Sequence, residues 1–353
     1  MSQPFAITLI SSLDPILRDI AVGCLLADQP NVVVVRHELN PGRPDEFRRL
    51  VLDRDGVLDD SWCHEWGCPT CNTKDDAITT LQRLIAAGNH GAAAIVLPLS
   101  QEPAPVARAL MHAVDSNTLP GGFLASAATV LDLPAFADDL LGDSLLADSN
   151  RHISEADRRS VGEALAPQVA YADFVLTSTK SDATGGTLLD HIRGRGSHRI
   201  DQFTSQDLSR LFHHLHHFPL ASSRVDPRLA AANGAPAEAG VWTLELTSPA
   251  GVHPDRLLDR IQQLGAKGVR GRGCFWTPHD PDLACVWDGA GGQVSIGICG
   301  DWTDTTPSTR LVFTGIGEKD HRISEAFADI LLTPEESGQD WTEVPNALAA
   351  WLS

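Results

Sequence analysis

Apolar runs and segments of helical periodicity alternate along the first half of the chain. Residues 6–11 are mostly apolar and predict a first buried strand. Asp14 and Pro15 then predict a helix start, with Asp14 as N-cap and Pro15 at the first helical position. Apolar residues recur at helical spacing over 16–25, and residues 31–35 form a second apolar run. This order of strand, helix and strand predicts a parallel sheet.

The same alternation continues through the first 222 residues. Further strands are predicted at 92–97, 123–131 and 171–177, and further helices at 76–87, 106–113 and 154–168. The last of these helices begins at Ser154 and Asp157, a spacing that resembles a capping box. The pattern predicts an α/β fold in which a parallel sheet carries helices on both faces.

The second half of the chain has a different order of elements. Residues 223–239 are rich in Ala and Pro and show no periodicity, which is typical of a linker. Strands are predicted at 240–247, 269–276, 285–287, 294–299 and 310–314, with helices after His253 and over 321–332. We therefore expect a first domain at 1–222, a linker at 223–239 and a smaller α+β domain with an antiparallel sheet at 240–353.

Charge narrows the range of partners. The 353 residues carry a formal net charge of -19. Because each phosphate contact needs a cation, a chain this acidic is not expected to present a broad nucleic-acid surface, and we expect no DNA partner. Any contact with a ribonucleoprotein would use protein surfaces or a small basic patch. The candidate basic residues are Arg193, Arg195, Arg199, Arg270 and Arg272.

Localisation is expected to be cytoplasmic. The first residues lack the basic region of a signal peptide, and no apolar run is long enough to span a membrane. The seven cysteines are an odd number, and Cys24, Cys274, Cys285 and Cys299 lie within apolar patterns. Such cysteines are typical of reduced core residues.

A cysteine-rich stretch at residues 61–76 is the strongest chemical signal. Cys68 and Cys71 form a Cys-x-x-Cys pair, a spacing that lets two thiolates bind one soft cation such as Zn²⁺. Cys63 and His64 are candidates to complete the site, as is a partner protein. A redox pair and two inert thiols are the alternatives. The redox reading is the weakest, because no strand-to-helix junction is predicted before the pair.

Residues 213–217 contain a second candidate, a cluster of histidines. If the segment is helical, His213, His216 and His217 share one face and form an auxiliary metal site. An interfacial helix with exposed histidines is favoured instead, because no nearby carboxylate or cysteine completes a ligand set.

The junction between the first strand and first helix lacks a phosphate-binding loop. Such a loop uses glycines, whose backbone N–H groups surround the phosphates, and a lysine that reaches them. Residues 11–18 contain neither glycine nor lysine. Asp14 adds a negative charge, and Pro15 removes a donor. We therefore expect no nucleotide hydrolysis at this position.

Several motifs resemble the CobW family of metal-chaperone GTPases. The run Val252-His253-Pro254-Asp255-Arg256-Leu257 resembles the helix start of its C-terminal domain. Residues 269–276 and 310–317 are similar to two strands of that domain, and Gln168 to Asp173 resembles a segment of its first domain. The resemblance implies a P-loop-NTPase-like first domain, here degenerate because it has no phosphate loop, followed by a CobW C-terminal-like domain.

The departures from the family pattern bear on function. The family's Gly-Cys-x-Cys-Cys metal motif is here Gly67-Cys68-Pro69-Thr70-Cys71, and its acidic switch motif survives only as Glu102-Pro103. The guanine-reading motif is Thr179-Lys180-Ser181-Asp182, which is close to intact. The resemblance therefore implies a reversible zinc site at Cys68 and Cys71, with GTP binding not expected.

This pattern of losses is similar to a narrower actinobacterial type, the mycobacterial zinc-starvation factors. The resemblance implies a non-catalytic, zinc-responsive adaptor that recruits a ribosome hibernation-promoting factor to the small ribosomal subunit as a stress response. The alternative is a zinc metallochaperone that binds GTP through Thr179, Lys180 and Asp182 and serves a client metalloprotein.

Overall fold

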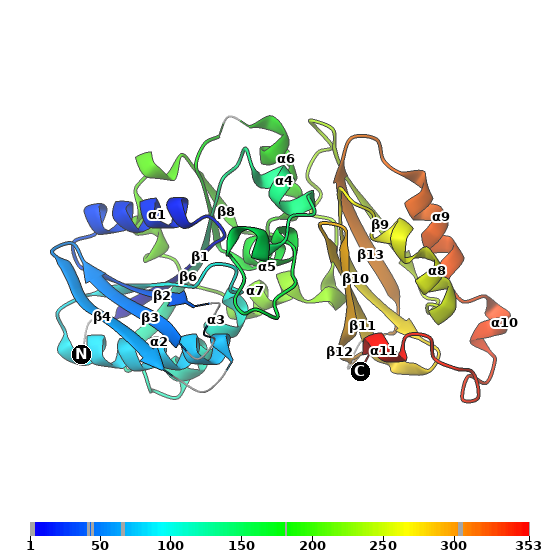
Figure 1. Cartoon of the computed structure of the whole chain (residues 1–353), viewed down its shortest axis with the longest axis horizontal. Helices are drawn as coiled ribbons and strands as arrows, with labels where there is room; N and C mark the ends of the chain where they lie inside the picture. Colours follow the sequence, from blue (N-terminus) through cyan, green and yellow to red (C-terminus); the bar gives the residue numbers. More distant parts are fainter. Residues whose placement is uncertain are drawn as a thin grey trace. The chain divides into compact units, whose positions relative to one another are not determined.

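A computed structural model describes residues 4–40, 43, 46–64, 68–180, 182–302 and 306–352 (Figure 1). The chain divides into two compact units. The first contains Met1–Phe136, Ser144–Asp182 and Arg193–Ser223, and the second contains Ala137–Asp143, Ala183–Ile192 and Arg224–Ser353. Two short segments, 137–143 and 183–192, thus belong to the second unit although they precede residue 222.

The first unit is built on an eight-stranded sheet in the order β4-β3-β2-β5-β1-β6-β7-β8. The strands are β1 (Phe5–Ser12), β2 (Val32–Leu39), β3 (Glu46–Asp53), β4 (Gly56–His64), β5 (Ala92–Val96), β6 (Gly122–Leu131), β7 (Phe174–Thr177) and β8 (His198–Asp201). From β2 to β8 the neighbours are parallel, which confirms the predicted sheet. At the other edge β3 and β4 form an antiparallel hairpin that the sequence patterns did not predict.

Helices cover both faces of this sheet, as predicted (Figure 1). They are α1 (Pro15–Asp28), α2 (Pro69–Ala87), α3 (Pro103–Asp115), α5 (Val161–Tyr171) and the start of α7 (Phe218–Val225), with 3-10 turns η1 (Leu146–Ser149), η2 (Phe203–Ser205) and η3 (Leu208–Leu211). On one face, Ala21 and Leu25 of α1 share a core with Phe203 and Leu208. Helices α2 and α3 pack against each other on the opposite face.

Helix α5 begins later than the sequence predicted. Its capping box is at Ser160, whose hydroxyl accepts the Glu163 N–H at 3.2 Å while Glu163 accepts the Ser160 N–H at 2.6 Å. The expected start at Ser154 is wrong, because the Asp157 carboxylate instead binds the guanidinium of Arg159 at 2.9 Å. The helix continues to Tyr171, which shortens the following strand.

The second unit is an antiparallel sheet with a layer of helices, as predicted. The five strands run in the order β12-β11-β10-β13-β9. They are β9 (Val241–Ser248), β10 (Val269–Thr277), β11 (Asp280–Ala290), β12 (Gln293–Asp301) and β13 (Thr309–Ile316), and the helices are α4 (Phe136–Leu141), α6 (Ala183–Ile192), α8 (Pro254–Leu264), α9 (His321–Ile330), α10 (Pro334–Ser337) and α11 (Ala349–Leu352), with the 3-10 turn η4 (Pro227–Leu229). Its core includes Leu257, Trp287, Phe313 and Phe327. Among the residues described in either unit, no helix is long and apolar enough to cross a membrane.

Candidate functional site

The two cysteines of the Cys-x-x-Cys pair lie at the start of α2. Cys68 is the N-cap residue, Pro69 occupies the first helical position, and Cys71 lies in the first turn. The Cys71 N–H donates to the Cys68 sulfur at 3.2 Å, and the two Sγ atoms are 2.9 Å apart. Cys68 is exposed and Cys71 is half-buried. Both sulfurs therefore converge on one accessible point.

The helix start makes the two thiols unequal. The hydrogen bond shared with Cys71 lowers the pKa of Cys68, and backbone N–H groups of Cys71 and Thr70 act in the same direction. The same shared hydrogen bond raises the pKa of Cys71. Thiolate is the form that binds metals and acts as nucleophile, and this arrangement favours the thiolate at Cys68 over Cys71.

The redox interpretation was considered the weakest because no strand-to-helix junction was predicted before the cysteine pair, and that prediction was wrong. Strand β4 ends at His64 and α2 begins at Pro69, so the pair does follow a strand and does cap a helix. Residues 65–67, including Gly67 of the predicted motif, lie outside the described residues. The helix starts seven residues earlier than the predicted 76, because Cys68 and Pro69 supply the cap.

Cys63 and His64, the other candidate ligands, lie at the end of β4. Cys63 is paired with Phe47 of β3 and His64 with Glu46. The His64 ring is largely exposed, with its Nδ1 atom 3.6 Å from the Glu46 carboxylate. Within the described ranges, no group of three or more His, Cys, Asp or Glu side chains could hold a metal ion. Here the described residues bring two thiols together, half of a tetrahedral set.

A buried ion pair that no sequence pattern indicated anchors α2 to the sheet. Asp76 of α2 accepts a hydrogen bond from His37 Nε2 of β2 at 2.8 Å and another from the Arg49 guanidinium of β3. Burial raises the pKa of Asp76, but His37 and Arg49 outweigh it and hold this pKa below its ordinary value. The helix that carries the cysteines is thereby fixed in position.

At the junction of β1 and α1, the Asp14 side chain occupies the N–H groups that could otherwise bind an anion. Only Leu13 and Asp14 separate the strand from the helix. Asp14 Oδ1 accepts the N–H groups of Ile16 at 2.8 Å and Leu17 at 2.9 Å. These donors at a helix N-terminus are the groups that a phosphate would otherwise use, so a carboxylate already fills the anion position.

Arg18, which follows in α1, also binds partners within the protein. Its side chain is 1% exposed, and its guanidinium donates to Glu38 at 2.6 Å and to the Leu97 carbonyl at 3.3 Å. The buried positive charge of Arg18 therefore neutralises a carboxylate of the chain itself.

The remnant guanine-reading motif lies after β7, at the carboxyl edge of the sheet. The Thr177 hydroxyl is 2.9 Å from the Thr179 carbonyl and 2.6 Å from the Asp201 carboxylate. Lys180 is exposed and Asp182 is half-buried, while Ser181 lies outside the described residues. Ligands of open α/β sheets bind at this edge, and a nucleotide role for Thr179, Lys180 and Asp182 stays a prediction.

The histidine cluster has no common helical face. Residues 212–217 connect η3 to α7 and are not helical. His216 is buried, with Nδ1 2.6 Å from the Asp173 carboxylate and Nε2 3.1 Å from the Tyr171 hydroxyl. The expectation of no nearby carboxylate was therefore wrong. His213 and His217 are exposed, so the central histidine is a core residue and its neighbours point elsewhere.

The five candidate basic residues do not make an exposed patch. Arg270 is 6% exposed and pairs with Asp288 at 2.6 Å. Arg272 donates to the Arg224 carbonyl at 2.9 Å, and burial lowers its pKa to about 10. Arg199 pairs with Asp201, and Arg193 donates to the Ser197 carbonyl. Arg195 is exposed. Most of these side chains hold the fold together.

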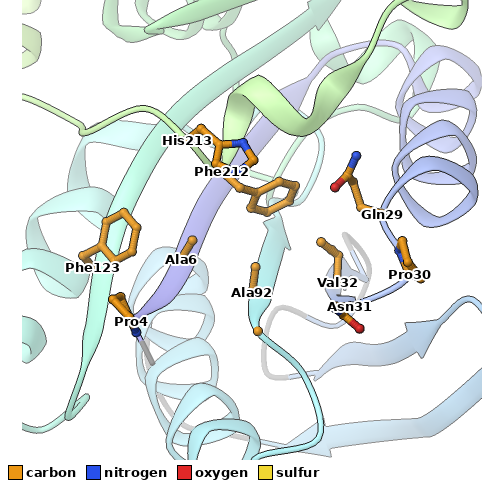
Figure 2. Close-up of a pocket in the computed structure, with 11 residues that line it drawn as sticks. Pro4, Ala6, Gln29, Pro30, Asn31, Val32, Ala92, Phe123, Phe212 and His213 are labelled. Carbon is orange, nitrogen blue, oxygen red and sulfur yellow. The ribbon is translucent and has the colours of Figure 1, made fainter. Parts of the chain in front are cut away.

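A cavity of about 390 Å³ opens at the amino ends of β1, β2, β5 and β6 (Figure 2). Its lining is mainly apolar, with Ala6, Val32, Ala92, Phe123 and Phe212, and with polar groups from Gln29, Asn31 and His213. It lies at the edge of the sheet opposite to the β1–α1 junction. Its lining residues suit an apolar group and offer little catalytic chemistry.

Comparison with known proteins finds a family match over part of the chain and several similar proteins. Residues 241–331 match the family model of the cobalamin synthesis protein CobW C-terminal domain. Over an alignment of 361 residues the chain is 25% identical to zinc chaperone Rv0106 of Mycobacterium tuberculosis, covering 95% of this chain and 85% of the relative. The uncharacterized protein Mb0109 of Mycobacterium bovis matches to the same extent. The crystal structure of the Zn(II)-bound YjiA GTPase from E. coli covers 94% of this chain and 100% of its own, with 17% identity and a TM-score of 0.38.

The family match is confined to the second unit. The matched segment runs from the start of β9 to the end of α9, so the second unit carries the CobW C-terminal domain.

Proposed function

We propose that this chain is a zinc-responsive, CobW-like protein of metal homeostasis that works without hydrolysing nucleotide. The observation that carries the proposal is the exposed pair of Cys68 and Cys71 sulfurs, 2.9 Å apart at a helix N-terminus. The relative named as a zinc chaperone supports the choice of metal.

The donor set fits Zn²⁺ as cargo or signal. Thiolates are preferred zinc ligands, and the partial positive charge of a helix N-terminus favours them over thiols. Cys68 and Cys71 would hold the ion, with Cys63, His64 or a partner's side chains in the remaining positions. Two fixed ligands give weaker binding than a closed set of four, which suits exchange of the metal rather than a structural role.

The closed β1–α1 junction supports the absence of hydrolysis. The Asp14 carboxylate accepts the N–H groups of Ile16 and Leu17, which a phosphate would otherwise use, and residues 11–18 contain no lysine to reach a phosphate. A switch without nucleotide must be read directly from the occupancy of the metal site.

We further propose the finer role of an adaptor that recruits a hibernation-promoting factor to the small ribosomal subunit when zinc is scarce. The chain's charge of -19 favours docking on protein components over RNA. The alternative is a metallochaperone that binds GTP through Thr179, Lys180 and Asp182 and loads a client metalloprotein. The surviving Lys180 and Asp182 at the carboxyl edge of the sheet favour this second candidate.

The test is a zinc titration against a competing chelator. We expect the wild type to bind zinc and the double variant Cys68→Ala, Cys71→Ala to lose most of that affinity. Cys24→Ala is the matched control, because Cys24 is a half-buried thiol far along the sequence from the pair. Equal affinity in wild type and double variant would overturn the proposal.

An affinity pull-down separates the two finer roles. The same proteins are used as bait in extracts of zinc-limited and zinc-replete cells. Ribosomal proteins and a hibernation factor captured by the wild type in a zinc-dependent manner support the adaptor. A GTP-dependent metalloprotein client would support the metallochaperone instead.

A further inference from the structure

We infer that Cys68 and Cys71 are also a reversible thiol–disulfide pair, so that oxidation and metal compete for the same two sulfurs. The competition rests on the proposed zinc site, whereas the disulfide itself rests only on the geometry. The sulfurs are 2.9 Å apart, and Cys68 is exposed to reagents in solution. Oxidation would thus regulate the site without any nucleotide.

The helix start brings the two residues within reach of a disulfide. The N-cap residue and the third helical residue lie about one turn apart, which places their side chains on the same face. The Cys71 N–H already donates to the Cys68 sulfur at 3.2 Å, which orients that sulfur towards Cys71. Pro69 fixes the backbone between them without needing a hydrogen-bond partner for its nitrogen. Little backbone movement is needed to close the bond.

Two of the other thiols are poorly suited to this chemistry. Cys274 and Cys285 are 1% and 2% exposed. Burial raises the pKa of Cys274 to about 11 and that of Cys285 to about 12. Buried thiols of this kind react slowly with oxidants. Oxidation should therefore favour the pair at the start of α2 over these two buried thiols.

The reaction with a hydroperoxide balances in two steps. The Cys68 thiolate attacks the O–O bond, an S–O bond forms, the O–O bond breaks, and the second oxygen leaves as water or alcohol. The Cys71 sulfur then attacks Cys68, the S–S bond forms, and the hydroxyl leaves as water with the Cys71 proton. The two thiols lose two electrons, which reduce the peroxide. A dithiol reductant reverses the change by exchange.

Zinc and the disulfide exclude each other. A sulfur in a disulfide has no thiolate charge to give to a metal, so oxidation releases bound zinc. In return, zinc holds both thiolates and slows their attack on the oxidant. Low zinc and oxidising conditions would then have the same effect, because each leaves the Cys68–Cys71 site without metal.

The experiment treats the full chain, freed of metal, with hydrogen peroxide and maps the thiols by peptide mass spectrometry. We expect one cross-linked species containing Cys68 and Cys71, lighter by two hydrogen atoms and restored by a dithiol. In Cys71→Ala we expect a sulfenic acid at Cys68, trapped by a dimedone probe. Zinc added beforehand should slow oxidation by about tenfold or more.

The outcomes separate this inference from the proposed function. Reduced or over-oxidised Cys68 with no link to Cys71 would overturn the disulfide, even if zinc binds. A disulfide in a protein that binds no zinc would leave the disulfide standing and remove the proposed function. Equal oxidation rates with and without bound zinc would overturn the competition. Cys24→Ala is the control, and it should oxidise as the wild type does.

Discussion

Asp76 of α2 and His37 of β2 lie 2.8 Å apart, carboxylate to ring nitrogen, with the His37 side chain fully buried. This contact ties the helix that begins at the two cysteines to the parallel part of the sheet. Arg49 binds the other carboxylate oxygen from β3. The helix is therefore held at one point by two strands, while Cys68 at its start is exposed.

Replacing Asp76 should destabilise the first unit. Asp76→Asn leaves Arg49 and His37 without their buried anion, and we expect a loss of about 3 kcal/mol in the free energy of unfolding. Urea unfolding at neutral pH measures this loss. Asp75→Asn is the matched control, because Asp75 is the exposed neighbour on the same helix, and it should change stability by less than about 0.5 kcal/mol.

The effect of Asp76 should depend on pH in a defined direction. The pKa of this carboxyl is lowered in the folded protein, so its stabilisation is present above the ordinary carboxyl pKa and is lost as pH falls through the lowered value. The gap between wild type and Asp76→Asn should therefore narrow below about pH 4. A gap that is constant from neutral pH to pH 3 would contradict the ion pair.

Nucleotide turnover should be absent. With Asp14 accepting the Ile16 and Leu17 N–H groups, phosphates have no cradle at the β1–α1 junction. We expect phosphate release from GTP or ATP at the background rate, with and without zinc, and no change in Lys180→Ala. Zinc-stimulated release that disappears in Lys180→Ala or Asp182→Ala would refute this expectation and favour the GTP-binding alternative.

Alkylation should reveal the unequal thiols. The pKa of Cys68 is lowered by the hydrogen bond shared with Cys71, so its rate of reaction with iodoacetamide should rise at a lower pH than for an ordinary thiol of about 8.5. In Cys71→Ala the midpoint for Cys68 should move upward, because the shared hydrogen bond is lost. Cys24 serves as internal reference, since burial raises its pKa. A Cys68 midpoint that is the same in both proteins would assign the shift to the helix start alone.

Of the histidines in the cluster, we expect His216 to contribute most to the free energy of unfolding. His216→Ala leaves the buried Asp173 carboxylate without its ring partner and the Tyr171 hydroxyl without its acceptor, and we expect a loss of about 3 kcal/mol. His213→Ala, an exposed neighbour, should cost less than about 0.5 kcal/mol. Similar losses for both variants, measured by urea unfolding, would show that the cluster acts as a unit.

The fold could be predicted because its core strands are apolar runs. Residues of β1, β2 and β5 are buried almost throughout, which makes such runs visible in the sequence. The hairpin of β3 and β4 escaped prediction because β3 is only partly buried and β4, at the sheet edge, is largely exposed. Cross-strand ion pairs such as Arg48 with Asp60 stabilise it in place of apolar alternation.

The candidate site could be predicted only in part. The spacing of Cys68 and Cys71 indicated that two sulfurs meet. It did not indicate a helix start, because cysteine is an unusual N-cap and the first turns of α2 are mostly polar. The partners of Asp76 and His216 come from other strands and loops far along the chain, so no local pattern could reveal them.

The Asp14 carboxylate at the start of α1 bears on whether the protein could change state in one direction only, as a hydrolysing switch does. A switch driven by nucleotide hydrolysis runs in one direction, because each cycle converts a nucleoside triphosphate irreversibly to the diphosphate and phosphate. The Asp14 carboxylate, which binds the N–H groups at the start of α1, is covalently part of the chain. Unlike a nucleotide phosphate, it is neither hydrolysed nor exchanged with solution. On the proposed function, the state of the protein is set by binding equilibrium alone. It follows the concentrations of the ligands that bind elsewhere on the chain, and it reverses when those concentrations reverse.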